Sequence, residues 1–564
     1  MTLEDRLDIL GRGWRGPLLA AIVALIGALP GLVALPPLDR DESRFAEASA
    51  QMLESGDFVT IRFQETPRFN KPVGIYWLQA AAVKALSQVE DRAIWAFRVP
   101  SLLGVMLAAA ACAWGAAAFM RPGQSLMAGA MLGASFLLAT EGAIAATDGV
   151  LAGAVTTAMA ALARLYLAKR GGPAAGRGVK TLFWAALALS VLVKGPIGPL
   201  VVGLTLAALA LWERRIEWLK GLGWGWGLIL MAAVLGPWAM AITVASDGAF
   251  WGAAVGGDLA PKLAGGQEGH AAPPGFHLAL LPLTLFPAVL LLPAGLTAGW
   301  RARAEPAVRF SLCWLVPSWL VFEVAPTKLV HYTLPLFGAL AWLMARALAE
   351  PPGRLARLSG AALVILGAGV LAAAGPVAMS RVGDWSGAPW AVAAGALFAA
   401  AGAGGALLLL RRRARWAMAA AGALALGAHA ALAAGVAPAL RPLWLSDRTA
   451  RTLAAADFDP RDGVTPGPVT VAGYEEPSLV FLLGATTELG DADDAADAVS
   501  EGRPAIVETR QEPAFRAALA GQGLAARVVG QAAGLDYSNN RRDILRIWRS
   551  PPPPPAATPG KAAP

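Results

Sequence analysis

The pattern of hydrophobic and polar positions divides the chain into long apolar runs separated by short charged segments. Runs of about twenty apolar residues recur between residues 16 and 440, and this length is enough for a helix to cross a hydrocarbon layer of about 30 Å. The runs are continuous and do not alternate in polarity, which favours helices over barrel strands. They predict about thirteen spans, near residues 16–36, 97–119, 125–142, 147–168, 181–194, 196–212, 224–246, 277–298, 309–324, 330–349, 357–379, 387–410 and 416–439.

Basic side chains concentrate in every second short loop. If the N-terminus is cytoplasmic, the cytoplasmic segments carry clusters such as Arg12 with Arg15 and the run Arg411, Arg412 and Arg413, whereas the opposite short loops carry at most one Lys or Arg each. Cytoplasmic loops of membrane proteins are enriched in Lys and Arg. With an odd number of spans, the C-terminal part of the chain is predicted to lie outside the cytoplasm.

Two longer segments, 37–96 and 247–276, fall on the predicted outer side. In the first, Phe45, Ala48, Met52 and Leu53 form an apolar stripe at helical spacing, and "KPVGIYWLQAAAVKAL" follows as a second short helix. Both are too short and too polar to span, so they are predicted to be amphipathic helices lying in the membrane interface. The second segment is rich in glycine and proline and is predicted to be a loop.

Beyond residue 440 the chain changes character. The runs "PVTVAG", "RPAIVET" and "RDILRIW" are typical of strands, and "EPSLVFLL", "DADDAADAVS" and "EPAFRAALAGQG" are typical of helices. We therefore expect three parts: a transmembrane domain at 1–440 with an outer loop at 37–96, a small soluble periplasmic α/β domain at 441–550, and a disordered proline-rich tail at 551–564.

Composition supports the assignment to membrane proteins. The 564 residues are 56% hydrophobic and 15% charged, whereas soluble domains are about a quarter charged. The net charge of +8 sits largely in short loops between spans and does not indicate a nucleic-acid partner. Cys112 and Cys313 both lie inside apolar runs, so neither a disulfide framework nor a zinc site is indicated.

Polar residues gather at the predicted outer ends of the spans and in the outer loops. Lysines on this face run against the orientation rule, and a phosphate ligand would explain them, because Arg and Lys both bind phosphate oxygens. Carboxylates beside them are suited to act as a general base. A site with both charges at the membrane boundary fits a lipid-phosphate substrate. The set comprises Asp41, Glu42, Arg44, Lys71, Asp148, Lys194, Lys262, Lys328, His331 and Tyr332.

Structural explanations of the same residues remain open on spacing alone. Asp41, Glu42 and Asp148 are each suited to the first turn of a helix, where acidic side chains are favourable. Lys71 precedes a proline and is compatible with a solvated loop charge. Histidines such as His331 more often pack or form hydrogen bonds than bind metal.

Several motifs together resemble a known family. "LDRDESRFAEASAQMLESGDFVTIRFQETPRFNKPVGIYWLQA" begins at residue 38, and "FRVPS", "TDGVLA", "LVKGPIGP", "GQEGHAAPPGF" and "PTKLVHYTLPLFGALA" follow in order up to residue 341. In content and order they resemble glycosyltransferase family 39, in its aminoarabinose transferase-like branch, which is related to the protein O-mannosyltransferases. The resemblance covers about residues 16–345.

The resemblance implies a type C multi-spanning glycosyltransferase fold and a polyprenyl-phosphate sugar donor. Asp41 matches the leading carboxylate of the loop, a base or transition-state stabiliser, with Glu42 as its companion. Arg44 and Lys71 match residues that hold the donor phosphate, and Lys262 matches a further basic residue more loosely. Asp148, Lys194, Lys328, His331 and Tyr332 complete the set as possible substrate-binding residues. The expected reaction inverts the anomeric carbon.

The resemblance implies no certain cofactor. Several relatives have an acidic residue before the loop lysine that contributes to a metal site, but this chain has Asn70 there, a poor metal ligand. A divalent metal held in that way is therefore not expected, and a metal held otherwise stays open. No nucleotide-binding motif is present.

The expected function is transfer of a sugar, aminoarabinose-like in this branch, to a periplasmic acceptor such as lipid A. A protein acceptor, another envelope glycan, and a transporter or flippase of a lipid-linked sugar are the alternatives. The expected partners are the polyprenyl-phosphate sugar, the acceptor glycolipid or glycan, and membrane lipids, with no nucleic acid. We expect a monomer in the bacterial inner membrane with a cytoplasmic N-terminus.

Overall fold

The computed structural model describes residues 2–259, 271–462 and 467–551. The chain divides into two compact units. The helical unit comprises residues 1–36, 48–89 and 93–440, and the sheet unit comprises residues 37–47, 90–92 and 441–564. The sheet unit therefore includes the start of the first outer segment as well as the C-terminal region.

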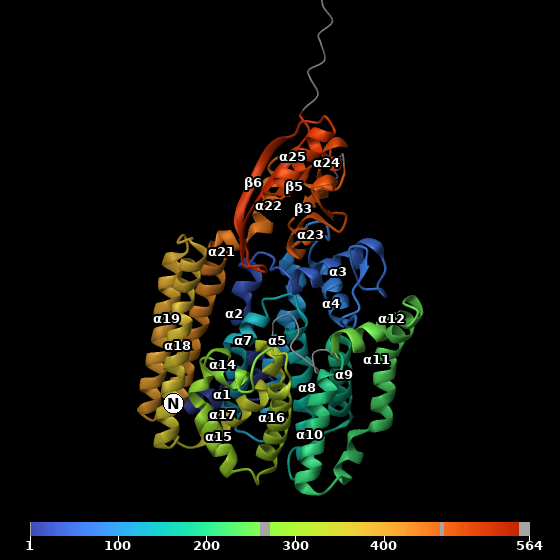
Figure 1. The fold of residues 1–564 in the computed structure, drawn as a ribbon. Helices are drawn as coiled ribbons and strands as arrows, with labels where there is room; N and C mark the ends of the chain where they lie inside the picture. The colour runs from blue at the N-terminus through green and yellow to red at the C-terminus, as the bar shows by residue number, and fades with distance from the viewer. Residues whose placement is uncertain (1, 260–270, 463–466, 552–564) are drawn as a thin grey trace, which may run out of the picture. The chain divides into compact units, whose positions relative to one another are not determined.

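The first half of the helical unit is a series of helices joined by short turns (Figure 1). A two-residue hairpin, β1 (Arg62–Phe63) with β2 (Thr66–Pro67), interrupts it. The helices are α1 (Leu3–Leu10), α2 (Arg15–Ala34), α3 (Asp41–Ser55), α4 (Gly74–Leu86), α5 (Ile94–Ala116), α6 (Pro122–Gly133), α7 (Phe136–Glu141), α8 (Thr147–Ala168), α9 (Arg177–Lys194), α10 (Ile197–Glu213), η1 (Glu217–Leu222), α11 (Trp224–Ala245), α12 (Ala249–Trp251) and η2 (Gly252–Leu259). Residues 41–47 of α3 belong to the sheet unit.

The second half of this unit is also helical, with several segments interrupted by prolines or short 3₁₀ turns. α18, α19 and α20 pack side by side. The elements are α14 (Phe276–Thr284), η3 (Ala288–Leu291), α15 (Leu292–Arg301), α16 (Pro306–Val324), η4 (Val330–Leu336), α17 (Phe337–Arg346), η5 (Ala347–Ala349), α18 (Arg354–Val382), α19 (Ala388–Leu410), α20 (Ala414–Ala430), η6 (Ala431–Val436) and α21 (Ala437–Ala439).

Among the described residues, nine helices are long and apolar enough to cross a membrane, or ten if the bent pair Phe276–Thr284 and Ala288–Arg301 is one span. The expected class, a multi-spanning helical membrane protein with a small C-terminal sheet region, is thus confirmed, but the count of thirteen is supported only to nine or ten. The other three predicted spans are helical but fall short. Residues 125–142 break into α6 and α7, α9 carries three basic residues, and α10 has 17 residues.

The stretch "VKGPIG" forms a tight turn between two neighbouring helices. α9 ends at Lys194, Gly195 adopts a φ of 58°, and α10 begins at Ile197. A φ in this range favours glycine, and the following Pro196 cannot continue α9 because it lacks an N–H. α9 and α10 pack against each other, so the stretch reverses the chain.

α8 is the central helix of the unit. Its most apolar stretch is 94% buried, and it packs against α5, α9, α10, α16 and η4. Glycines allow the closest of these approaches: a Cβ on Gly153 would lie 2.4 Å from the carbonyl oxygen of Gly104 on α5. Small residues at such crossings let the backbones of membrane helices touch, and the crossing fixes the start of α8 in a buried position.

The first outer segment contains the two short helices that the sequence predicts, α3 and α4. The second outer segment differs from the prediction, because residues 249–259 are helical in α12 and the π-helical η2. The stretch is rich in glycine but also holds Ala249, Ala253 and Ala254 and no proline. With no proline to remove a hydrogen bond, helical bonding continues through it.

The sheet unit is a five-stranded mixed sheet with helices packed on it (Figure 1). The strand order is β4-β3-β5-β7-β6, in which β3 is parallel to β4 and β5, and β7 is antiparallel to β5 and β6. The elements are η7 (Arg441–Leu443), α22 (Leu445–Ala454), η8 (Pro460–Asp462), β3 (Thr470–Ala472), α23 (Pro477–Leu483), β4 (Glu488–Gly490), α24 (Ala492–Ser500), β5 (Ala505–Glu508), α25 (Glu512–Gly521), β6 (Arg527–Asp536) and β7 (Arg541–Arg549).

The three strands and three helices predicted here are all present, and β4, β6 and α22 are additional. The core joins α24 and α25 to the sheet through residues such as Val499, Val507, Phe515 and Trp548. β6 was not predicted because "RVVGQAAGLD" contains two glycines and no sustained alternation of apolar and polar residues. β6 forms because its backbone pairs with β7, although its own sequence has no strand pattern.

Candidate active site

A buried charged cluster lies at one end of the helical unit. Asp148 is in the first turn of α8, Lys194 is the last residue of α9, and His331 is in η4. The Lys194 ammonium lies 2.6 Å from Asp148 Oδ1, and the two side chains are only 13% and 8% exposed. The structure therefore brings together three residues that the sequence proposed separately.

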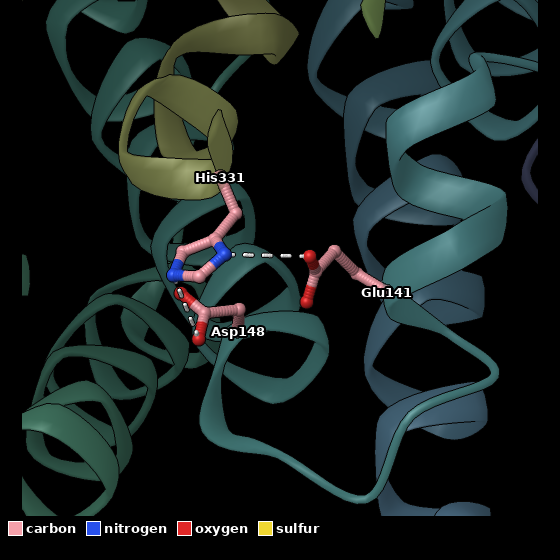
Figure 2. A group of neighbouring side chains, drawn as sticks. All are labelled: Glu141, Asp148 and His331. Atoms are coloured by element: carbon pink, nitrogen blue, oxygen red, sulfur yellow. Dashed lines mark ion pairs between the residues drawn. The ribbon is translucent and has the colours of Figure 1, made fainter. Parts of the chain in front are cut away.

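Glu141, at the end of α7, is the fourth member of this cluster. Figure 2 shows the His331 ring between the two carboxylates. His331 Nδ1 lies 3.4 Å from Glu141 Oε1, and Nε2 lies 3.6 Å from Asp148 Oδ2. Each ring nitrogen of His331 thus faces a different carboxylate. We call Glu141, Asp148, Lys194 and His331 the polar centre.

Helix ends explain why the polar centre forms where it does. An acidic side chain is favourable in the first turn of a helix, where Asp148 lies, and a basic one in the last turn, where Lys194 lies. Thr147 Oγ1 also donates to Asp148 Oδ2 over 3.1 Å. Helix dipoles, an ion pair and a hydrogen bond together offset the cost of burying these charges.

Tyr332 and Lys328 differ in their relation to the polar centre. The Tyr332 ring centroid lies 5.7 Å from the Lys194 ammonium and 5.5 Å from the His331 ring centroid, so Tyr332 belongs to its wall. Lys328 is 3% exposed, and its ammonium donates to the carbonyls of Ala272 and Ala325, each over 2.7 Å. These bonds give Lys328 a structural role in joining two segments.

The polar centre also offers the donor atoms of a metal site. One ligand atom each from Glu141, Asp148 and His331 lies within 4.8 Å of the others. However, the two ring nitrogens face different carboxylates, and Lys194 already pairs with Asp148. The geometry fits an ion-pair network better than a metal centre.

Three of the residues proposed as catalytic or phosphate-binding, Asp41, Glu42 and Arg44, lie at the start of α3, in the sheet unit. Asp41 begins the helix, and its side chain is 71% exposed. The Arg44 guanidinium, 42% exposed, lies 4.0 Å from the Asp41 carboxylate. Glu42 is buried and accepts a hydrogen bond from the Leu38 N–H over 2.8 Å, so it caps the chain that leads into the helix.

The other two proposed phosphate-binding residues, Lys71 and Lys262, do not belong to the described part of the sheet unit. Lys71 belongs to the helical unit, and its ammonium donates to the Asn70 carbonyl over 3.1 Å. Lys262 lies outside the described residues.

Asp39, to which the sequence analysis assigned no role, holds the segment before Asp41. Its carboxylate accepts a hydrogen bond from the Ser478 hydroxyl, and its N–H donates to the Tyr537 hydroxyl over 2.6 Å. Burial, opposed by the Ser478 hydrogen bond, raises the pKa of Asp39 to about 6. Burial and the nearby Asp39 charge raise the pKa of Glu476 to about 7.

Arg98, in the motif "FRVPS", holds the end of α2 within the helical unit. It is fully buried and donates to the carbonyls of Leu32, Leu35 and Pro36 over 3.1, 2.6 and 2.9 Å. It thereby satisfies carbonyls at the C-terminal end of α2. The sequence signal for Arg98 is an arginine inside an apolar run. The corresponding signal for Glu141 is an acidic residue shortly before the "TDG" motif.

Comparisons with known proteins give a consistent result. The model of a family described as dolichyl-phosphate-mannose-protein mannosyltransferase matches residues 15–247. An undecaprenyl phosphate-alpha-4-amino-4-deoxy-L-arabinose arabinosyl transferase of Pseudomonas paraeruginosa is 30% identical over 328 residues, covering 57% of this chain and 58% of the relative. One from Pseudomonas aeruginosa strain LESB58 is 31% identical over 359 residues, covering 61% and 63%. The matched region thus spans about three fifths of these relatives.

Among solved structures, ArnT from Cupriavidus metallidurans in the apo state has a TM-score of 0.73 at 22% identity, covering 94% of this chain and 97% of that one. The same protein bound to undecaprenyl phosphate has a TM-score of 0.72 at 21% identity, with the same coverage. The type C fold and the resemblance to glycosyltransferase family 39 that the sequence motifs indicated are confirmed.

Proposed function

We propose that this chain is a bacterial inner-membrane glycosyltransferase that moves a sugar from a polyprenyl-phosphate donor to an envelope acceptor such as lipid A. The names of its relatives support an aminoarabinose-type sugar on undecaprenyl phosphate, and the bound lipid of a structural neighbour supports a polyprenyl-phosphate ligand.

The polar centre is the observation that carries the proposal. Charged side chains buried at the end of membrane helices are costly, and they usually mark a substrate site. Here two carboxylates, an ammonium and an imidazole meet where four segments, α7, α8, α9 and η4, begin or end. The relatives of this chain are named for a charged lipid. We assign Asp148, Lys194, His331 and Tyr332 to substrate binding and keep Lys328 as a structural neighbour of that site.

The chemistry is assigned to the start of α3 and the outer loops. The acceptor oxygen attacks the anomeric carbon from the side opposite the phosphate, and the carbon–oxygen bond to the phosphate breaks. Polyprenyl phosphate leaves with the electron pair, so the reaction inverts the carbon. Arg44, Lys71 and Lys262 stabilise the charge that develops on the leaving phosphate.

Asp41 takes the proton of a hydroxyl acceptor, or stabilises positive charge on the sugar if the acceptor is an ionised phosphate. Its exposed side chain beside Arg44 is accessible to a substrate. Glu42 supports this site by holding the segment before the helix. No step requires a metal or a nucleotide.

A transfer assay tests the role of Asp41. Purified protein is given a radiolabelled polyprenyl-phosphate sugar and lipid A, and the wild type is compared with Asp41→Asn. We expect a loss of transfer of at least a hundredfold, the lower end of what a general base contributes (about 10²–10⁴). Glu54→Gln, an exposed acid on the same helix, is the control and should retain activity. Undiminished transfer by Asp41→Asn would remove this residue from the mechanism.

The acceptor is tested in cells. Mass spectrometry of lipid A, other envelope glycans and envelope proteins, with and without the protein, identifies which molecule gains the sugar. A sugar on protein would favour the activity named in the family description, and a sugar on lipid A the activity named for the relatives. A flippase would change the distribution of the lipid-linked sugar between leaflets and modify no acceptor.

A further inference from the structure

A cavity of about 820 Å³ opens in the helical unit at the ends of three helices. Lys169 follows the last residue of α8, Glu213 ends α10, and Arg309 is in the first turn of α16. α8 and α16 are candidate membrane spans, so the cavity lies at a membrane boundary. Since α8 has 22 residues and rises about 33 Å, this boundary is opposite the one where Asp148 lies.

The floor of the cavity is a fixed ion-pair network. Glu213, whose side chain is 7% exposed, accepts hydrogen bonds from the Tyr166 hydroxyl and from Arg170, and also from Arg309 Nη1 over 2.6 Å. The Arg170 guanidinium lies 3.7 Å from the Tyr166 ring centroid. The Arg309 guanidinium lies 6.0 Å from the Trp212 ring centroid. Two arginines are thus held in place beside aromatic rings, and ordering them costs a ligand little.

The lining of the cavity carries more basic than acidic side chains. Four basic and two acidic side chains line it, for a net charge of +2. Lys169 and Arg215 are exposed, and within the part of the chain that the structure describes neither has an ion-pair partner. An anion would therefore meet two preorganised arginines and two free cations.

The walls indicate a lipid rather than a soluble anion. Trp212 and Trp218 line the cavity, and tryptophan is enriched where membrane helices meet the headgroup region. Basic pockets between membrane helices on the cytoplasmic side bind anionic headgroups, and the predicted orientation makes this face cytoplasmic. We propose that the cavity binds the phosphodiester headgroup of an anionic glycerophospholipid from the adjoining leaflet.

The test measures lipid binding, which does not depend on the proposed enzymatic activity. Full-length protein in detergent is titrated with phosphatidylglycerol or phosphatidylcholine, and retained lipid is counted by native mass spectrometry. The wild type should bind one phosphatidylglycerol in preference to phosphatidylcholine. Lys169→Gln with Arg215→Gln should weaken that binding roughly 30-fold, because each cation contributes about 1 kcal/mol near an anionic lipid and 1.4 kcal/mol is tenfold.

A matched control changes the same charge on the same face. Arg177→Gln with Arg354→Gln alters two exposed arginines at the first turns of α9 and α18, outside the cavity, and should leave phosphatidylglycerol binding unchanged. Melting temperatures of both double variants verify folding, and Arg215→Gln alone should give about half of the effect in free energy. Equal loss in the control, no headgroup preference, or displacement of the lipid by millimolar inorganic phosphate would overturn the proposal.

Discussion

At the scale of single residues, Asp148 and Lys194 form the buried ion pair on which the polar centre depends. Their side chains are 8% and 13% exposed and 2.6 Å apart. Removing one partner of a buried pair leaves an uncompensated charge, which is more costly than removing both. This asymmetry separates the contribution of the pair to stability from its contribution to function.

We expect Lys194→Met to destabilise the protein by about 3 kcal/mol and to abolish transfer. Asp148→Asn combined with Lys194→Met should recover most of the stability without recovering activity. Melting temperature and the transfer assay, applied to both single variants and the double variant, provide the measurement. A double variant that transfers sugar normally would reduce the pair to a structural role.

Asp39 and Glu476 make the stability of the protein depend on pH. Their pKa values in the folded state, about 6 and about 7, exceed the ordinary values of 3.8 and 4.5. Between about pH 4 and pH 7 the folded state therefore binds more protons than the unfolded state, and stability falls as pH rises through this window.

Asp39→Asn with Glu476→Gln should flatten this dependence. Between pH 5 and pH 8 we expect the melting temperature of the wild type to fall by about 3 °C more than that of the double variant. Asp493→Asn, an exposed acid on α24, serves as the control and should follow the wild type. Parallel curves for wild type and double variant would show that the two carboxyls are not the source.

At the scale of elements, the crossing of α5 and α8 positions the buried end of α8. Gly104, Gly149 and Gly153 bring the two backbones together, and a Cβ on Gly104 would lie 2.5 Å from the Gly149 carbonyl oxygen. Glycine is needed here for close packing, since these residues lie inside regular helices. A methyl group at this crossing must move one helix.

Gly153→Ala should therefore lower the free energy of unfolding by about 1–3 kcal/mol, the usual cost of overpacking. Gly203→Ala is the matched control, because Gly203 lies in α10 and its added Cβ would meet no atom within 4 Å. It should be neutral or slightly stabilising, as alanine favours a helix. Thermal unfolding followed by tryptophan fluorescence distinguishes the two variants. Equal stability of Gly153→Ala and Gly203→Ala would contradict the close packing of α5 and α8 at Gly153.

At the scale of the whole molecule, the chain is two compact units, and the start of the first outer segment groups with the C-terminal sheet. Two hydrogen bonds are part of that grouping: the Ser478 hydroxyl donates to the Asp39 carboxylate, and the Asp39 N–H donates to the Tyr537 hydroxyl. A helix beginning at a proposed catalytic residue is thus held by residues more than four hundred positions away. We propose that the sheet unit lies on the outer side of the membrane.

Cysteine labelling tests this orientation. Cys112 and Cys313 are buried, so background labelling should be low. A membrane-impermeant maleimide applied to spheroplasts should label Glu501→Cys, which is exposed in the sheet unit, and should label Arg12→Cys only after lysis. The opposite pattern would invert the topology and place the sheet unit in the cytoplasm.

Much of the architecture was predictable because it depends on neighbours along the chain. The length of an apolar run determines whether a helix can span a membrane, so α2, α5, α8 and α11 were found where the sequence indicated. Breaks inside runs were less predictable. Residues 125–142 read as one span, yet the chain turns at Ser135, between α6 and α7.

The candidate site was predictable as a collection of residue types and not as an arrangement. Asp148, Lys194, His331 and Tyr332 were proposed from their place at span ends, and Glu141 and Asp39 were missed. Lys328 shows the limit of that reasoning, because its ammonium is used by two backbone carbonyls. Whether a charge is available depends on its neighbours in space.

The sequence by itself determined that the chain is a helical membrane protein with a C-terminal sheet region, and its motifs indicated a resemblance to glycosyltransferase family 39. Apolar length, charge bias and local motifs act over a few residues, and each can be read in order. Only the tertiary structure decided that Glu141, Asp148, Lys194 and His331 share one cluster and that Asp39 anchors the segment before Asp41. Those contacts join distant segments, and helix packing, which no local pattern specifies, sets their distances.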